Sequence, residues 1–258
     1  MLPYPHCESI YNKCSCSIPV LHVRGIVKRQ PKGVVTVISP WNFPLNLSMR
    51  AIAPAVALGN TVVVKPATNT PVVGGLLFGT LAEAAGIPDG AINVVTGRGS
   101  DVGDAVASHS ESDAVAFTGS TPVGKHVAGL AAENLAIQAM ELGGNNAHVV
   151  TESADLDAAI DSAVFGTFVH QGQVCISINR HIVHESVYDE YVERLTERAE
   201  SLPAGSAHDD TVVGPIIDES QRDEMLEYVE ETVEAGATLE TGGSTVKLGG
   251  VDDSLVVE

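Results

Sequence analysis

Basic residues are scarce in this sequence, and their scarcity limits what the protein can bind. The 258 residues include 14 Lys and Arg against 33 Asp and Glu, which gives a formal net charge of -19. Such a charge repels nucleic acids and anionic membranes, so neither is an expected partner. The acidic residues are spread along the C-terminal half, which favours a solvated acidic surface suited to high salt over an acidic interaction tail.

No export signal or membrane-spanning segment is recognisable. The first nine residues, MLPYPHCES, place no basic residue ahead of an apolar core, and no apolar run reaches the length of a bilayer span. A cytoplasmic protein is therefore expected. Four cysteines in a chain of this length do not form a disulfide framework.

The first 29 residues differ from the remainder, because no periodic pattern of apolar residues is visible in them. Cys7, Cys14, Cys16 and His22 could form a metal site, but a one-residue spacing between cysteines is not that of a zinc knuckle. We expect residues 1–29 to be a poorly ordered leader that does not match the rest, and we expect no metal site.

From Gly33 onward, short strands rich in Val and Ile alternate with amphipathic helices. The expected strands are 34–38, 61–65, 91–95, 114–117 and 136–140, and the expected helices are 45–58, 72–85, 102–108 and 122–132. This order predicts an α/β fold in which parallel βαβ units form a doubly wound sheet covered on both faces. We assign residues 30–142 to this cofactor-binding domain.

A second α/β section occupies residues 143–258. Its expected strands are 147–150, 181–184 and a short one near Thr238, and its expected helices are 155–169, 187–201 and 219–235. The Gly-rich end of the chain contains no obvious closing element. We therefore predict only part of a second domain.

A turn between an expected strand and helix, Gly119 to Gly124, is a candidate phosphate site. Ligands of parallel sheets bind at the carboxyl ends of the strands, where the next helix presents free N–H groups. Gly119 permits a tight turn, Ser120 or Thr121 can cap the helix, and Pro122 suits the first helical position. An ordinary strand-to-helix turn has the same pattern.

The usual dinucleotide fingerprint, G-x-G-x-x-G, is absent. The nearest match, Gly97, Gly99 and Gly103, has the wrong spacing, which disfavours an ordinary Rossmann dehydrogenase. Lys65 ends an apolar strand, where a charged side chain either extends to water or points at a ligand.

Cys175 lies at the centre of the segment Phe165–Arg180, FGTFVHQGQVCISINR. It follows an apolar helix, so its sulfur can be presented at the end of that helix as a thiolate nucleophile. A lone cysteine is more commonly a small buried apolar residue. His170 is five residues earlier, a helical spacing that does not bring the two side chains together, so we expect His170 to pack within the helix.

Two further residues have side chains suited to catalysis at expected strand ends. Asn42, between Trp41 and Phe43, can donate its amide N–H to a developing oxyanion, or it is an ordinary turn residue. Glu141 can remove a proton from water, or it is a glutamate that faces solvent.

Taken together, the motifs resemble the aldehyde dehydrogenase superfamily from about Gln30 to the C-terminus. The motifs, in chain order, are Pro40-Trp41-Asn42-Phe43-Pro44, Lys65-Pro66-Ala67, Phe117-Thr118-Gly119-Ser120, Glu141-Leu142-Gly143-Gly144 and the Cys175 segment. The resemblance implies NAD(P)-dependent oxidation of an aldehyde to an acid, with Cys175 as nucleophile and Glu141 as general base. It also implies an oxyanion hole made by Asn42 and the backbone N–H of Cys175.

The same resemblance implies a cofactor site in a variant of the dinucleotide fold. The matching positions are Trp41, Lys65, Pro66, Thr68, Gly119, Ser120, Gly124 and Leu142, with Lys65 on a ribose. Family members that prefer NAD often have a glutamate where this chain has Thr68. Without an acid to repel a 2′-phosphate, NADP is expected to be used at least comparably to NAD.

The resemblance also has gaps. Complete family subunits are considerably longer, and the segments missing before and after this chain include oligomer interfaces, so the typical homo-oligomer is in doubt. A fragment of the enzyme, a non-catalytic nucleotide-binding or assembly module and a coenzyme A-acylating enzyme all remain open. Glu141 disfavours the last, because acylating relatives generally lack this base. Residues 46–50, together with 170–173 and 178–180, resemble the branch that acts on benzaldehyde and vanillin.

Overall fold

A computed structural model describes residues 8–10, 13–18, 23–246 and 255–257 of the chain. The chain divides into two compact units, Met1–Glu141 and Leu142–Glu258, and each is considered by itself. The division falls one residue before the domain boundary predicted from the sequence.

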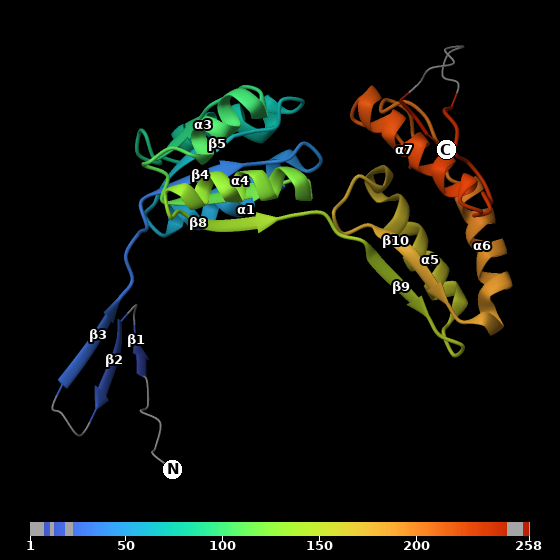
Figure 1. Cartoon of the computed structure of the whole chain (residues 1–258), viewed down its shortest axis with the longest axis horizontal. Coiled ribbons are helices and arrows are strands. Elements are labelled where there is room, and N and C mark those ends of the chain that lie inside the picture. The colour runs from blue at the N-terminus through green and yellow to red at the C-terminus, as the bar shows by residue number, and fades with distance from the viewer. Residues whose placement is uncertain (1–7, 11–12, 19–22, 247–254, 258) are drawn as a thin grey trace. The chain divides into compact units, whose positions relative to one another are not determined.

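The first unit contains a five-stranded, all-parallel sheet (Figure 1). Its strands are β4 (Val34–Ile38), β5 (Thr61–Lys65), β6 (Ile92–Val94), β7 (Ala114–Thr118) and β8 (Ile137–Glu141), in the order β6-β5-β4-β7-β8. The chain starts at the centre, adds β5 and β6 on one side, then returns to add β7 and β8 on the other. The reversal makes a topological switch point between β4 and β7, which is where open parallel sheets bind their ligands.

Four helical segments connect these strands. They are α1 (Pro44–Ala57), a π-helical turn (Val72–Leu76) continuing into α2 (Leu77–Ala84), a second π-helical turn (Gly99–Gly103) continuing into α3 (Asp104–Ala107), and α4 (Thr121–Glu133). Because strand crossovers are right-handed, the two directions of winding place α1 and α2 on one face and α3 and α4 on the other. The predicted doubly wound α/β fold is confirmed.

The core of the first unit lies under α1 and α2. It is built around Val37, Ile52, Val62, Val64 and Phe78, all nearly inaccessible to solvent. The Val-rich strands are buried on both faces, which explains why the sequence shows apolar runs there in place of alternation.

The N-terminal segment corrects the prediction of a leader without regular structure. It contains a three-stranded antiparallel sheet of β1 (Glu8–Ile10), β2 (Lys13–Ile18) and β3 (Val23–Lys28). Strand pairing joins segments that are separate in sequence, so a search for periodicity within one segment misses it. Cys14 and Cys16 lie in β2, whereas Cys7 and His22 lie outside the described residues.

The second unit contains a parallel pair of strands, in the order β10-β9, and several helices. Its elements are β9 (Asn146–Val150), α5 (Leu156–Phe168), a 3-10 turn (Val169–Gly172), β10 (Ile178–Val183), a 3-10 turn (Glu185–Val187), α6 (Tyr188–Glu200) and α7 (Glu219–Glu234). The strand predicted near Thr238 is wrong. The described residues pair Thr245 with Val257 instead, because an extended segment needs a neighbouring strand for its backbone hydrogen bonds.

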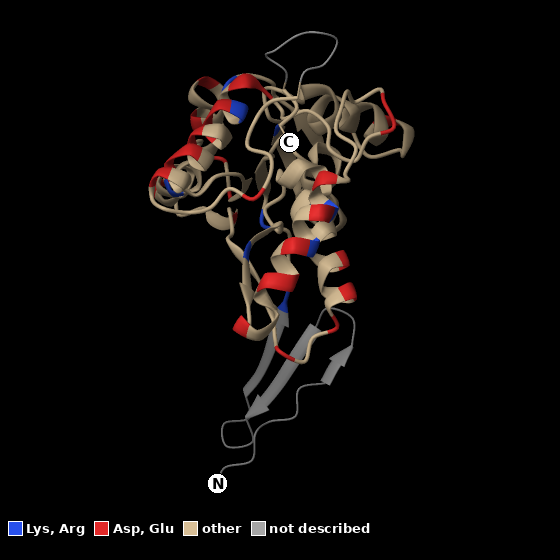
Figure 2. Ribbon diagram, turned by 90° about the vertical axis from the view of Figure 1, so that its right-hand side faces the viewer, with Lys and Arg blue, Asp and Glu red and all other residues tan. Residues whose placement is uncertain are grey.

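Helices α5 and α6 pack over β9. Val150, Ile160, Ala163 and Tyr191 form the buried centre of this unit. The Asp155 carboxylate caps α5 by accepting from the backbone N–H groups of Asp157 and Ala158. Acidic residues are distributed over the helices and loops of both units (Figure 2). Within the described part of the chain, no helix has the length and apolar character needed to cross a membrane.

Two histidines share the hydroxyl of the buried Tyr191. His181 Nδ1 lies 2.7 Å and His148 Nδ1 3.3 Å from Tyr191 Oη, and the two rings are 5.7 Å apart between centroids. Burial raises the pKa of Tyr191 to about 12, so the hydroxyl keeps its proton. Burial, and then the nearby His148, lower the pKa of His181.

We expect His181 to make the stability of the second unit depend on pH. A histidine whose pKa is lowered by folding binds protons more readily when unfolded, so stability is full above its ordinary value near 6.5 and falls as pH drops below it. Thermal unfolding between pH 5 and pH 8 (about the range over which histidines titrate) measures this slope. The slope should be reduced in His181→Asn and kept in a control at the exposed His208; an unaltered slope in His181→Asn would contradict the assignment.

Candidate active site

The carboxyl edge of the five-stranded sheet gathers most of the predicted site. Asn42 follows β4, Lys65 ends β5, Gly119 follows β7 and Glu141 ends β8. Because all these strands are parallel, their carboxyl ends lie along the same edge. Residues far apart in sequence, from Asn42 to Glu141, are therefore brought to one edge of the sheet.

Asn42 lies in the turn between β4 and α1. Its Oδ1 accepts a hydrogen bond of 3.0 Å from the backbone N–H of Phe43, so the amide NH2 is the end of the side chain suited to donate to a ligand. The preceding Trp41 is half-buried. The buried Ser48 fixes the start of α1, since its hydroxyl donates to the Gly74 carbonyl at 2.9 Å and can accept from the hydroxyl of Ser39, 2.7 Å away.

Sequence reasoning missed Ser48. The signal that could have identified Ser48 is its place as a small polar residue among the apolar residues of the expected amphipathic helix 45–58.

Lys65 is buried, with only 5 % of its surface exposed. Its Nζ donates to the Pro66 carbonyl at 3.0 Å, and burial lowers the pKa of the ammonium group. Among the described residues, no carboxylate forms an ion pair with Lys65. A side chain that is 5 % exposed does not extend far into water, and the role of Lys65 toward a ligand stays a prediction.

Pro66 and Thr68 continue the segment beyond Lys65. Pro66 is fully buried, and a β-carbon at Gly75 would come within 2.5 Å of Pro66 Cγ, so the π-helical turn needs glycine there. Thr68 is exposed, and its hydroxyl is 3.4 Å from the Gly97 carbonyl.

The turn after β7 has the predicted position but a different physical basis. Gly119 does not have positive φ; glycine is required because a β-carbon would lie 2.5 Å from the ring of the buried Phe117. Ser120 takes the N-cap position of α4 without a side-chain capping bond, and Pro122 is the second helical residue, not the first. The buried Gly124 follows in the first turn.

Glu141 is joined to this turn and to α1. The N–H of Gly119 donates to the backbone carbonyl of Glu141 at 3.1 Å. Arg50 Nη2 lies 3.4 Å from Glu141 Oε1, and the two side chains are 61 % and 56 % exposed. The general-base candidate therefore lies beside the helix that begins next to Asn42.

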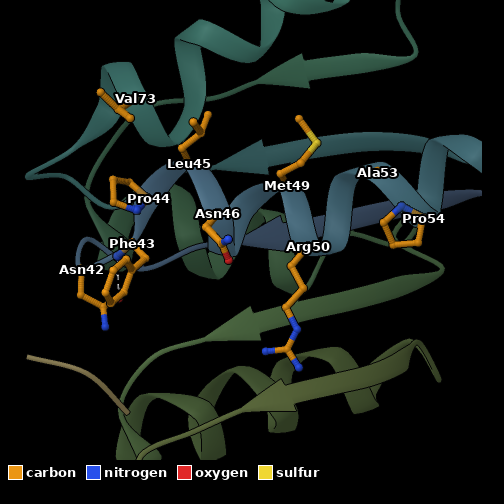
Figure 3. A pocket seen from close by; sticks show the side chains of 10 residues that line it. All are labelled: Asn42, Phe43, Pro44, Leu45, Asn46, Met49, Arg50, Ala53, Pro54 and Val73. Atoms are coloured by element: carbon orange, nitrogen blue, oxygen red, sulfur yellow. Dashed lines mark hydrogen bonds between the residues drawn. The ribbon is translucent and has the colours of Figure 1, made fainter. Parts of the chain in front are cut away.

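A cavity of about 720 Å³ lies against the exposed face of α1 and includes Asn42 and Arg50 in its lining. Asn46 and Arg50 point to the same side of the helix as Asn42, whereas Leu45 and Met49 point to the other side (Figure 3). Most of the wall is apolar, as in sites for small organic ligands.

In the second unit, Cys175 lies in a turn closed by a hydrogen bond of 3.0 Å from the N–H of Ser177 to the Val174 carbonyl. Its thiol is free and exposed. Helix α5 ends at Phe168, one residue before its predicted end, and the 3-10 turn Val169–Gly172 lies between it and Cys175. The expectation that His170 packs within the helix is wrong. His170 has a left-handed φ of 53°, as Gln171 does at 56°, and these residues turn the chain away from the helix axis.

Neighbouring segments hold the Cys175 turn. Asn146 Nδ2 donates to the carbonyls of Cys175 at 3.2 Å and Ser177 at 3.0 Å, and Gln173 Oε1 accepts from the N–H of Ile217 at 2.9 Å. Sequence reasoning missed Asn146 and Gln173 as positioning residues, because their partners are about 30 to 44 residues away.

Gly144 packs closely against this turn, since a β-carbon there would be 3.1 Å from the Cys175 carbonyl. Leu142, half-buried, opens the second unit two residues earlier.

The switch point of the first sheet, its buried lysine and its glycine turn are typical of a nucleotide-binding α/β protein, and the second unit adds an exposed thiol. Comparison with known proteins is more specific. Residues 8–257 match the sequence model of the aldehyde dehydrogenase family, so the chain belongs to that family. The match begins at residue 8, whereas the resemblance was expected to start at about residue 30.

The similar proteins include dehydrogenases of aromatic aldehydes. The chain is 48 % identical to vanillin dehydrogenase of Corynebacterium glutamicum over 84 % of its length and 46 % of that protein. It is 46 % identical to benzaldehyde dehydrogenase [NAD(+)] of Pseudomonas putida over 85 % of its length and 45 % of that protein. The chain thus spans about half the length of these curated relatives.

Solved structures share this fold. A NAD-dependent benzaldehyde dehydrogenase from Corynebacterium glutamicum matches with a TM-score of 0.81 and 42 % identity, covering 98 % of this chain and 52 % of that one. Betaine aldehyde dehydrogenase from Staphylococcus aureus, in complex with NAD+, matches with a TM-score of 0.92 and 36 % identity over 96 % and 49 % of the two chains.

Proposed function

We propose that this chain carries the cofactor site and the nucleophile of an aldehyde dehydrogenase that oxidises aromatic aldehydes to carboxylic acids with NAD+ or NADP+. The observation that carries the proposal is the placement of Asn42, Lys65 and Glu141 along one sheet edge at a switch point, in a member of this family. The exposed, free Cys175 supplies the remaining chemical group.

The chemistry requires a nucleophile because an aldehyde carbon does not readily release hydride until it has become tetrahedral. The Cys175 thiolate adds to the aldehyde carbon, and Asn42 with the Cys175 N–H stabilises the resulting oxyanion. A nicotinamide cofactor, which Lys65 and the turn at Gly119 and Ser120 would hold, would supply the hydride acceptor. Glu141 then takes a proton from the water that hydrolyses the thioester and frees Cys175.

The residues of the first unit fit a dinucleotide. Lys65 is a buried ammonium group whose one described hydrogen bond goes to a backbone carbonyl, so it can donate further bonds to ribose hydroxyls. Gly119, Ser120 and Gly124 form the start of α4, where N–H groups favour phosphate. Two of the similar proteins are NAD-dependent by name, and the betaine aldehyde dehydrogenase structure contains NAD+. The exposed Thr68 places no acid against a 2′-phosphate, so NADP is expected to serve as well.

Reduction of nicotinamide by the purified chain tests the function. Benzaldehyde should be oxidised faster than a short aliphatic aldehyde, with either NAD+ or NADP+, and benzoic acid should be the product. If the short aliphatic aldehyde is oxidised faster than benzaldehyde, the proposed preference for aromatic aldehydes is wrong. Cofactor binding without any oxidation would instead support the second candidate, a nucleotide-binding module.

Glu141→Gln is expected to lower turnover by about 100-fold or more, because the amide cannot accept a proton from water. The acyl group should then remain on Cys175 and be detectable as a mass increase of the intact chain after incubation with benzaldehyde and cofactor. The exposed Glu133→Gln is the matched control. Rapid acyl transfer to added coenzyme A by the unaltered chain would favour the acylating alternative, and full turnover by Glu141→Gln would remove Glu141 from the mechanism.

A further inference from the structure

One buried hydroxyl connects three segments of the first unit. Ser48 lies in α1 with none of its surface exposed. Its hydroxyl donates to the carbonyl of Gly74 in the π-helical turn at 2.9 Å. It can also accept from the hydroxyl of Ser39, which follows β4 and lies 2.7 Å away. Because a hydroxyl buried without a partner is costly, the end of β4 and the π-helical turn are both held to Ser48.

The contact between Ser39 and Ser48 closes the turn that carries Asn42. The two serines are nine residues apart, and Asn42 lies between them. Inside the turn, Asn42 Oδ1 accepts from the N–H of Phe43 at 3.0 Å, a bond drawn in Figure 3, and the N–H of Leu47 donates to the Phe43 carbonyl at 2.9 Å. These bonds shape the turn locally, whereas the contact between the serines joins its two ends. The position of the Asn42 amide therefore depends on Ser48.

The same hydrogen bonds reach the segment proposed to bind the cofactor. The backbone N–H of Ser39 donates to the carbonyl of Lys65 at 3.2 Å. On the other side of Ser48, the π-helical turn packs against Pro66, since a β-carbon at Gly75 would lie 2.5 Å from Pro66 Cγ. Ser48 thus joins the Asn42 turn to the segment that contains Lys65. Hydride transfer needs the aldehyde and the nicotinamide held in one geometry, which requires such a connection.

We propose that Ser48 is a positioning residue that holds the Asn42 amide in place relative to the segment Lys65–Pro66. The inference rests on the proposed function, in which Asn42 donates a hydrogen bond to the oxyanion. With no exposed surface, Ser48 does not touch a ligand and acts only through the turn. The bond to the oxyanion is strongest in the transition state, so a displaced Asn42 lowers kcat and leaves the KM for the aldehyde nearly unchanged.

A second pair of buried hydroxyls in the same unit provides a matched control. Thr36 Oγ1 lies 2.7 Å from Ser112 Oγ, and the two residues are 2 % and 4 % exposed. Ser112 precedes β7, so it lies toward the amino edge of the sheet, whereas Asn42 lies at the carboxyl edge. Ser112→Ala and Ser48→Ala therefore each remove one buried hydroxyl and should lower the thermal unfolding midpoint by similar amounts.

Ser48→Ala should lower kcat for benzaldehyde by about 10- to 100-fold, because a displacement of about 1 Å at a reacting group is enough to cost about 100-fold. The KM for benzaldehyde should change little, and Ser112→Ala should keep kcat. Adding Ser39→Ala to Ser48→Ala should cause little further loss of kcat, because the two hydroxyls act through one contact. An unchanged kcat in Ser48→Ala, or an equal loss of kcat in Ser112→Ala, would overturn the proposal.

Hydrogen exchange of the purified chain tests the positioning without any reaction. The N–H of Leu47, bonded to the Phe43 carbonyl within the turn, should exchange about 10-fold faster in Ser48→Ala than in Ser112→Ala, because the turn opens locally once its ends are no longer joined. If Leu47 exchanges equally in the two variants, Ser48 does not hold the turn and the proposal is wrong whatever the activity. If Leu47 exchanges faster in Ser48→Ala but the unaltered chain oxidises no aldehyde, the proposed function fails while the control of the Asn42 turn by Ser48 stands.

Discussion

Cys175→Ala should lower aldehyde-dependent reduction of NAD(P)+ by about 10⁴-fold or more, because it removes the atom that makes the aldehyde carbon tetrahedral. The exposed turn that holds Cys175 tolerates the change, since the side chain is free and fills no core position. Folding should therefore be preserved, with a thermal unfolding midpoint close to that of the unaltered chain. Loss of activity without loss of stability distinguishes a nucleophile from a packing residue.

The neighbouring Ile176 offers a matched control for Cys175. It is 76 % exposed in the same turn, and Ile176→Ala removes more side-chain volume than Cys175→Ala does. Ile176→Ala should keep much more of the activity. Labelling of the thiol by iodoacetamide, followed by peptide mass spectrometry, should modify Cys175 in parallel with the loss of activity. If Cys175→Ala still oxidises aldehydes, Cys175 is not the nucleophile and the proposed mechanism is wrong.

The alternation of strands and helices in the first unit could be predicted from local sequence. Strands such as Val34–Ile38 and Thr61–Lys65 are Val-rich because both faces are covered, and their predicted limits match the structure. The π-helical turn at Val72–Leu76 could not be predicted, because it depends on Gly75 packing against Pro66. Strand pairing at the N-terminus was missed for a similar reason: a strand is defined by its neighbour.

The candidate site was predictable in its residue types but not in its contacts. Asn42, Lys65 and Glu141 stand at strand ends, and a parallel sheet brings such positions to one edge. The Arg50–Glu141 pair joins residues 91 positions apart and has no local signal. The burial of Lys65 is likewise a tertiary property, since the sequence only places it after three valines.

Lys65→Met should abolish tight cofactor binding and at the same time stabilise the first unit. The ammonium group of Lys65 is buried without a carboxylate partner in the described part of the chain, and burial lowers its pKa. At neutral pH the folded state therefore contains a poorly solvated charge, which an apolar side chain of similar length removes. The gain in the free energy of unfolding should be about 1 to 2 kcal/mol.

The pH dependence of this gain identifies its cause. Because folding lowers the pKa of Lys65, the unaltered chain regains stability as pH rises from the lowered value toward the ordinary value near 10.5, where the unfolded chain also loses its proton. The stability difference between Lys65→Met and the unaltered chain should consequently shrink in alkaline solution. Denaturant unfolding at neutral and alkaline pH measures the difference, and calorimetric titration with NAD+ measures the lost binding.

The exposed Lys32 gives the matched control for charge removal. Lys32→Met should alter neither cofactor affinity nor the pH dependence of stability appreciably, because its ammonium group is already solvated. A destabilised Lys65→Met would show that the lysine packs or pairs in the fold and is not held for a ligand. If Lys65→Met is stabilised but still binds NAD+ tightly, the buried charge of Lys65 does not contribute to cofactor binding. Only stabilisation combined with lost binding supports the view that the folded protein retains this unfavourable charge for its ligand.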